Sequence, residues 1–283
     1  MLLATLCRLF WFGKRRDTAK NIMKEYLSEL FRYRELLYMI AYRDVRVRYK
    51  QSIMGVLWAV LMPILIVGAG IVVRYGYAIA SGKAMASADM ASVAVKSLPW
   101  AFLVSSIRFS CTSLINNHSL VTKVYFPKDI FPMAAVLASA FDFLVASGAL
   151  VVFLLVIRAG WSVQLVWVPL LLVMMLFLTV GIALVVSAAS LFLRDVKYVV
   201  EIGLTFGIFF TPVFYDVRML GSKGSWLLFN PVAPILEGLG ACVVRHQPPN
   251  LPWLGYSFVC GLTLLVGGYI FFKDLEPAFA ESI

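Results

Sequence analysis

The stretch YRDVRVRYKQSIMGVLWAVLMP, residues 42–63, passes from basic to wholly uncharged within its own length, and apolar sequence continues to residue 73. On a helical wheel over residues 33–50, three of its four cations lie within about 60° of one another, beside apolar stripes. Such a helix lies along a membrane surface, with its cations among anionic head groups, before the chain turns into the bilayer. Alternatively, each cation is only a topology signal. The residues expected at this interface are Tyr42, Arg43, Arg46, Arg48 and Lys50.

The composition excludes a soluble globular protein. Of 283 residues, 61% are hydrophobic and 14% are charged, and the mean hydropathy is +0.88. Several apolar runs of about 20 residues indicate membrane-spanning helices, because lipid requires each segment to satisfy its own backbone hydrogen bonds. The net charge of +10 would also suit nucleic acid, but 12 of the 25 Lys and Arg lie in residues 1–51, against five acidic residues. This asymmetry indicates the cytoplasmic face of a membrane and no nucleic-acid partner.

Hydropathy and charge together predict an all-α integral membrane protein with six transmembrane helices. The segments expected inside the cell hold 17 Lys and Arg and those expected outside hold seven, so both termini are predicted to be cytoplasmic. Residues 1–51 would form a cytoplasmic N-terminal domain, residues 52–272 the transmembrane domain and residues 273–283 a cytoplasmic tail. The expected spans are residues 52–73, 98–117, 130–157, 165–193, 198–214 and 252–272.

The predicted cytoplasmic loop between the second and third spans combines aromatic and charged side chains around a proline. A short, rigid element with exposed aromatic rings suits insertion into a groove of another protein. The alternative is that its rings and lysines only mark the membrane interface. The residues of this predicted coupling segment are Lys123, Val124, Tyr125, Phe126, Pro127, Lys128 and Asp129.

Two apolar pieces on the predicted outer side, residues 211–215 and 230–238, are interrupted by proline. Irregular backbone at membrane depth must pack against protein or line a water-filled cavity. We therefore expect short re-entrant or gate helices before the last span. The alternative is an outer hairpin that serves only packing. The candidate gate residues are Pro212, Phe214, Tyr215, Asn230, Pro231 and Glu237.

Four ionisable residues fall within or beside apolar segments: Arg108, Asp142, Glu201 and Glu237. Such groups are costly in lipid, so each is expected to face a partner or a wet cavity. One pairing would join Arg108 to Asp142 across adjacent spans. Aromatic faces suit a sliding sugar chain because they offer apolar contact without tight binding, although lipid contact or helix packing explains the same rings. The candidate channel-lining residues are Trp58, Trp100, Phe102, Arg108 and Phe109.

Signatures of enzymatic chemistry are absent from the sequence. His118 and His246 fall in predicted loops on opposite sides of the membrane, and no GxSxG or HExxH motif occurs. The pair Gly82-Lys83 is not a nucleotide-binding loop, because Tyr77 stands where the first glycine is needed. We therefore assign no catalytic residue, metal ligand or cofactor to this chain. Two alternatives from other classes are an integral-membrane glycan transferase acting without ATP, and a channel or scaffold independent of nucleotide.

Five motifs within residues 33–240 resemble, in the same order, those of one family: YKQSIMGVLWAVLMP, KVYFP, LRDV, TPVFY and NPVAPILEG. That family comprises the permease subunits of ABC exporters for polysaccharides and polyol phosphates, including O-antigen, capsule and teichoic acid. The resemblance implies a subunit that moves lipid-linked polysaccharide out of the cytoplasm. It does not distinguish the cargoes, and among them we favour O-antigen over capsule and teichoic acid. It also implies that KVYFP is the coupling helix for an ATPase, and that TPVFY and NPVAPILEG surround an extracytoplasmic gate.

The same resemblance implies the partners. The family works as two permeases with two ATP-binding ABC subunits, so the expected partners are a second copy of this chain, two such subunits, the lipid-linked polysaccharide and membrane lipids. ATP and Mg²⁺ would be bound by the partner subunit, and this chain would hold no cofactor. The implied location is the bacterial inner membrane. The long N-terminus before residue 33 departs from the family's pattern.

Overall fold

The structure is a computed structural model that describes residues 28, 31–50, 54–55, 57–80, 82, 86–124 and 126–279, apart from the side chains of residues 222 and 223. Residues 1–27 and Tyr125 lie outside the described residues. The predictions made for the start of the N-terminal domain and for that tyrosine therefore stay predictions.

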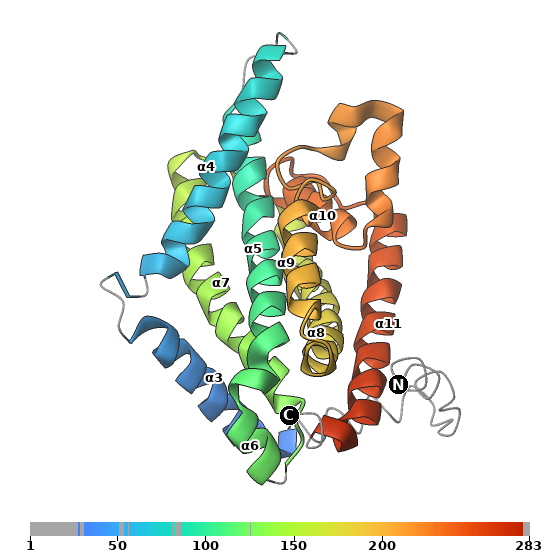
Figure 1. Ribbon diagram of the computed structural model, residues 1–283. Coiled ribbons are helices and arrows are strands. Elements are labelled where there is room, and N and C mark those ends of the chain that lie inside the picture. The colour runs from blue at the N-terminus through green and yellow to red at the C-terminus, as the bar shows by residue number, and fades with distance from the viewer. Residues whose placement is uncertain are drawn as a thin grey trace.

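The described chain is helical, without a strand, as predicted for an all-α membrane protein (Figure 1). The α-helices are α3 (Arg34–Tyr49), α4 (Leu57–Ala80), α5 (Ser87–Asn116), α6 (His118–Lys123), α7 (Ile130–Val156), α8 (Trp167–Phe192), α9 (Val196–Gly207), α10 (Ala233–Val243) and α11 (Leu251–Leu275). Three 3₁₀ segments accompany them: η1 (Val163–Val166), η2 (Val217–Phe229) and η3 (Glu276–Ala278).

Five helices of the described chain are long and apolar enough to cross a membrane. The shortest has 24 residues, which gives about 36 Å at the rise of an α-helix, more than the ~30 Å hydrocarbon core. They match the predicted spans one, two, three, four and six. Their bounds are Leu57–Ala80, Ser87–Asn116, Ile130–Val156, Val163–Phe192 and Leu251–Ala278.

The predicted fifth span is not one continuous helix. α9 has 12 residues and ends at Gly207, so it rises only about 18 Å. The chain then turns through residues 208–212, where the Thr211 hydroxyl donates to the Gly207 carbonyl (2.8 Å). Pro212 follows and has no backbone N–H to continue a helix. The described helices therefore do not confirm the count of six spans.

The predicted outer loop, residues 74–97, is also wrong in its extent. α4 continues through Ala80, and α5 begins at Ser87, 11 residues before the predicted second span. The cations Arg74 and Lys96, which the prediction placed in that loop, are 4% and 0% exposed. They can remain in helices because acidic side chains neutralise them. A hydropathy profile ends a span at such charges, although a paired charge can be buried.

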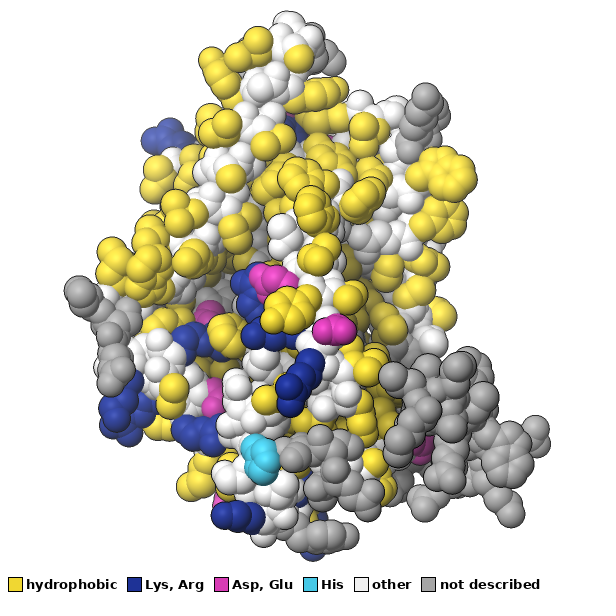
Figure 2. Space-filling model, in the orientation of Figure 1, with side chains coloured by type: hydrophobic (Ala, Val, Ile, Leu, Met, Phe, Trp, Pro, Cys, Tyr) yellow, Lys and Arg dark blue, Asp and Glu magenta, His cyan; other side chains and the backbone are white. Residues whose placement is uncertain are grey.

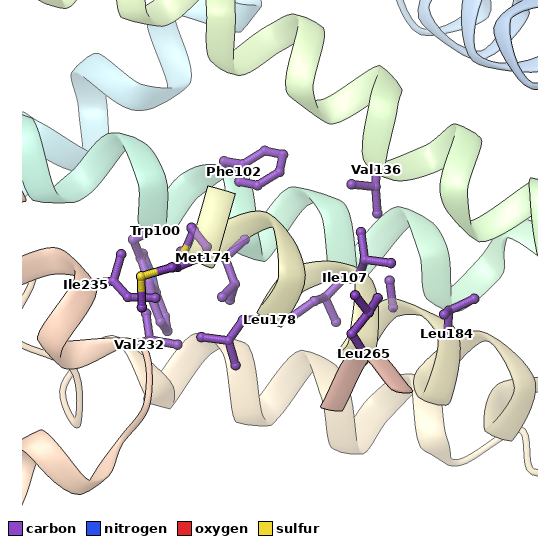
Figure 3. Packing of buried hydrophobic residues seen from close by; sticks show 14 of the residues in the cluster. Trp100, Phe102, Ile107, Val136, Met174, Leu178, Leu184, Val232, Ile235 and Leu265 are labelled. Atoms are coloured by element: carbon purple, nitrogen blue, oxygen red, sulfur yellow. The ribbon is translucent and has the colours of Figure 1, made fainter. Parts of the chain in front are cut away.

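The core forms around α5 and α8. α5 packs against α7 and α8, and α8 also packs against α11. Figure 3 shows Trp100 and Met174 beside Ile235 and Val232 at one end of this core, and Ile107 near Leu265 farther along. At the α8–α11 crossing the backbones touch, since a Cβ on Gly181 would lie 2.5 Å from the Leu264 carbonyl carbon. Small residues permit this close approach between membrane helices.

α3 confirms the helix predicted over residues 33–50 and packs against α7. It lies with α6 at one end of the molecule, while α10 lies toward the other end (Figure 1). Ile40 faces the protein at 5% exposure. Tyr38 and Tyr42 stack on each other on the exposed side, with ring centroids 6.3 Å apart.

Candidate functional site

The structure brings all five candidate channel-lining residues to one cavity. This cavity has a volume of about 520 Å³ and lies between α4, α5, α7 and α9, next to the end of α3. Trp58 comes from α4, and the other four come from one stretch of α5. The predicted channel residues in its wall are Trp58, Trp100, Phe102, Arg108 and Phe109.

Arg108, in the wall of this cavity, belongs to an ion pair that remains half exposed. Arg108 donates to both carboxylate oxygens of Glu201 on α9, from Nη2 at 2.6 Å and from Nε at 3.0 Å. Both side chains are 49% exposed, so in a membrane they require water or a further polar partner. On the face of the molecule that Figure 2 shows, acidic and basic side chains lie together at mid-height with hydrophobic side chains around them. The predicted pair of Arg108 with Asp142 is wrong.

Asp142 instead connects α7 to α3. Arg48 pairs with one of its carboxylate oxygens, and the Tyr49 hydroxyl donates to the other at 2.6 Å. Arg48 also lies over the Phe109 ring, 3.8 Å from its centroid. Of the four predicted interface cations, Arg48 and Arg43 thus contact protein, since Arg43 donates to Asn117 at 2.7 Å. The exposed cations are Arg46 and Lys50.

We expect Asp142→Asn to weaken the attachment of α3. The change leaves Arg48, which is 18% exposed, without its ionic partner, and an unpaired, mostly buried charge costs about 2 kcal/mol or more. Thermal unfolding in detergent should show a lower midpoint. Asp44→Asn is the matched control, because the Arg43–Asp44 pair is more exposed and such pairs contribute less than about 1 kcal/mol. Equal midpoints for the two variants would contradict this role of Asp142.

The predicted coupling segment begins at Lys123, the last residue of α6, and its end is anchored to the end of α11. Its described residues after Lys123 are not helical, so the helix that the resemblance implied at KVYFP is not found there. The Lys128 backbone N–H donates to Glu276 at 2.7 Å, and Lys273 pairs with Asp129 at 3.5 Å. Phe126 is half-buried and lies 5.5 Å from the Phe131 ring, so it is not the freely exposed tip that the sequence suggested. Lys123 and Val124 are exposed, whereas Asp129 is 1% exposed. Pro127 is half-buried.

The two predicted gate motifs meet. The Asn230 side-chain amide donates to the Thr211 hydroxyl at 2.9 Å, which joins the turn before α10 to the gate segment, defined here as residues 211–217. Phe214 is buried at 8% exposure, and the Tyr215 hydroxyl donates to the Phe209 carbonyl at 2.8 Å. Pro212 is buried, and Pro231 is half-buried in the turn.

Charged side chains gather beside the gate segment. We call this group the buried charge cluster: Arg74, Asp89, Lys96, Asp216, Glu237 and Arg245. Of these residues only Glu237 was a candidate from the sequence, because the positive-inside count treats every Lys and Arg as solvated. The spacing of Asp89, Ser92 and Lys96 puts three polar side chains on one helical face and could have indicated the cluster.

Burial raises the pKa of the Asp216 carboxyl, but the attraction of Lys96 and Arg74 outweighs burial and holds the pKa well below its ordinary value of 3.8. A lowered pKa stabilises the folded chain at any pH above that ordinary value. The contribution is lost only as the pH falls through the lowered pKa. Asp216 therefore stays ionised at neutral and mildly acidic pH.

Comparison with known proteins finds no matching family model, but three relatives align over nearly the whole chain. The O-antigen export system permease protein RfbA of Klebsiella pneumoniae is 29% identical over 264 residues, covering 92% of this chain and 98% of the relative. A second Klebsiella pneumoniae protein of that name is 27% identical over the same shares. The protein of that name from Myxococcus xanthus is 24% identical, over 91% of this chain and 98% of the relative. These matches confirm the resemblance noted from the motifs.

Proposed function

We infer that this chain is a permease subunit of the ABC polysaccharide exporter family. We propose that it moves a lipid-linked polysaccharide out of the cytoplasm and that this polysaccharide is O-antigen. The observation that carries the proposal is the similarity to O-antigen export permeases over 92% of the chain. The cavity supports it, because its aromatic faces and the half-exposed Arg108 suit a sugar chain that must slide.

A second copy of the chain would complete the passage. α4, α9 and the turn that follows α9 carry large apolar side chains that are more than half exposed, a surface that lipid or another helix must cover. We propose that two copies face each other across this surface and enclose the path of the polysaccharide. The side chains concerned include Val72, Tyr75, Phe206, Phe209 and Phe210.

ATP-binding subunits would dock at the end of the molecule that carries α3 and α6. Motion received at the coupling segment would pass directly into α7, which begins at Ile130, and through Glu276 and Lys273 into α11. ATP and Mg²⁺ belong to those subunits in this proposal, which places the chain in the inner membrane with both termini cytoplasmic.

The test is loss of export in the chain's own host. Cells that lack the chain are expected to accumulate lipid-linked polysaccharide on the cytoplasmic side and to lose it from the surface, with both restored by the wild-type chain. The accumulated glycan identifies the cargo as O-antigen, capsule or teichoic acid. Accumulation of an unconverted precursor, together with conversion of that precursor by the purified chain without ATP, would favour a glycan transferase instead.

Trp58→Ala is expected to slow export about fivefold, because a lost aromatic contact is worth roughly 1 kcal/mol. Trp58 is suited to the test because it lines the cavity yet remains 39% exposed. Trp58→Phe should retain most of the export rate. Trp161→Ala is the control, since Trp161 is 76% exposed and does not line this cavity. An unchanged rate for Trp58→Ala would remove Trp58 from the path.

A further inference from the structure

We propose that the buried charge cluster positions the gate segment, holding Phe214 seated between α4 and α5 so that the outer passage stays closed between export events. This inference rests on the proposed function for the meaning of closure. The position of Phe214 and its dependence on the cluster are properties of the chain alone, and they can be measured without cargo or ATPase.

The cluster joins four separate parts of the chain and is electrically balanced. Three cations face three carboxylates, and every cation contacts two of them. Lys96 pairs with Glu237 at 2.6 Å and with Asp216. Arg74 pairs with Asp216 at 3.0 Å and with Asp89. Arg245 completes the network at 3.4 Å from Asp216 and 3.3 Å from Glu237.

Asp216 is the centre of this network and belongs to the gate segment. It receives all three cations and also accepts a hydrogen bond from Ser92 at 3.1 Å. The cluster holds the backbone on both sides as well. Lys96 donates to the carbonyl of Tyr215 at 3.2 Å, and the N–H of Val217 donates to Glu237 at 3.2 Å. The segment is therefore fixed at three consecutive residues.

Arg74 and Lys96 lie one helical turn from the residues that contact or adjoin the Phe214 ring. The ring lies in a slot where a Cβ on Gly70 would be 2.5 Å from Phe214 Cδ1 and 2.6 Å from Val93 Cγ1. Arg74 follows Gly70 by four residues on α4, and Lys96 follows Val93 by three on α5. Residues at these spacings share a helix face. On α4 and on α5, the residue that lines the slot and the cation that binds Asp216 therefore lie on the same face of the helix.

Because its charges are largely buried, the cluster favours one position of the gate segment. Lys96 is completely buried, Arg74 is 4% exposed and Asp216 is 14% exposed on its side chain. Buried ion pairs add little net stability compared with apolar packing, but an unpaired buried charge is strongly unfavourable. The gate segment can therefore leave this position only if the charges move with it or become hydrated.

The experiment measures whether Phe214 is seated. Val93 is 0% exposed and, like the Phe214 ring, lies against Gly70. Val93→Cys in inserted protein should therefore react slowly with a membrane-impermeant maleimide, after subtraction of labelling in the chain without this substitution. Adding Asp216→Asn should speed labelling about tenfold or more, because it leaves the cations in excess and favours states in which they reach water. Arg218→Gln is the control, since Arg218 is exposed and bonds Gln247 outside the cluster.

A second variant separates positioning from folding. Lys96→Met with Asp216→Asn removes one cation and one anion, so the remaining cluster is again balanced, but the gate segment has lost its central tie. We expect near-normal amounts of this chain in the membrane and rapid labelling of Cys at position 93. Slow labelling of this chain at normal abundance would overturn the proposal. Failure of the exporter assignment would appear in the export assays and would leave the labelling unchanged.

Discussion

Replacing Tyr125 and Phe126 together by alanine is expected to abolish polysaccharide export while leaving the chain inserted in the membrane. Phe126 packs on Phe131 in the first turn of α7, and the Lys128 ammonium lies 4.5 Å from the centroid of the Phe126 ring. Truncation of Phe126 removes its contact with Phe131 and so loosens the link from the coupling segment to α7. The segment after them remains attached to Glu276 and Lys273, so α7 and α11 should keep their places.

The readouts are polysaccharide at the cell surface and ATP hydrolysis by the assembled complex. Export should fall to background, and hydrolysis should no longer respond to the permease. Trp161→Ala is again the control, because Trp161 follows the opposite end of α7. Normal export by the double variant would refute the assignment of residues 123–129 as the coupling segment.

Gly70→Ala is expected to make the resting protein leak. The added methyl group would overlap Phe214 and Val93 at the distances given above, and overpacking of this kind costs about 1–3 kcal/mol, enough to raise the unseated population at least about fivefold. Gly68→Ala provides a matched control in the same helix, since no atom outside its own helix backbone and chain neighbours lies within 4 Å of its added Cβ. Efflux of a small solute from liposomes containing purified protein measures the leak.

Phe214→Ala should leak as well, because the slot between α4 and α5 would be left unfilled. If neither Gly70→Ala nor Phe214→Ala increased efflux over Gly68→Ala, Phe214 would not form part of the gate. If only Phe214→Ala leaked, the ring would matter but its seat against Gly70 would not.

The long apolar helices could be predicted closely from the sequence. α7 and α8 begin and end within two residues of the predicted spans, because uninterrupted apolar runs and turn residues define them. The start of α5 could not be predicted, because Asp89 and Lys96 are typical of a loop unless their ionic partners are known. Those partners lie more than 100 residues away for Lys96, and no local pattern carries that information.

For the cavity, the types of residue could be predicted from the sequence, but their ionic partners could not. The types of residue that suit a sugar path could be chosen from α4 and α5 by chemistry, and they face one cavity. The pairing of Arg108 was mispredicted because adjacent spans in sequence were treated as adjacent partners. Glu201 is on α9, whose early end at Gly207 follows from the turn at Thr211 and Pro212 and was not anticipated.

Native mass spectrometry of the tagged chain, extracted gently from its own membranes, can decide whether this chain is the membrane subunit of an ABC exporter. We expect a complex of two copies of this chain with two copies of an ATP-binding subunit, and a retained lipid-linked glycan would identify the cargo. A chain that stays alone after crosslinking in the intact membrane, and that converts a lipid-linked sugar by itself, would contradict this assignment.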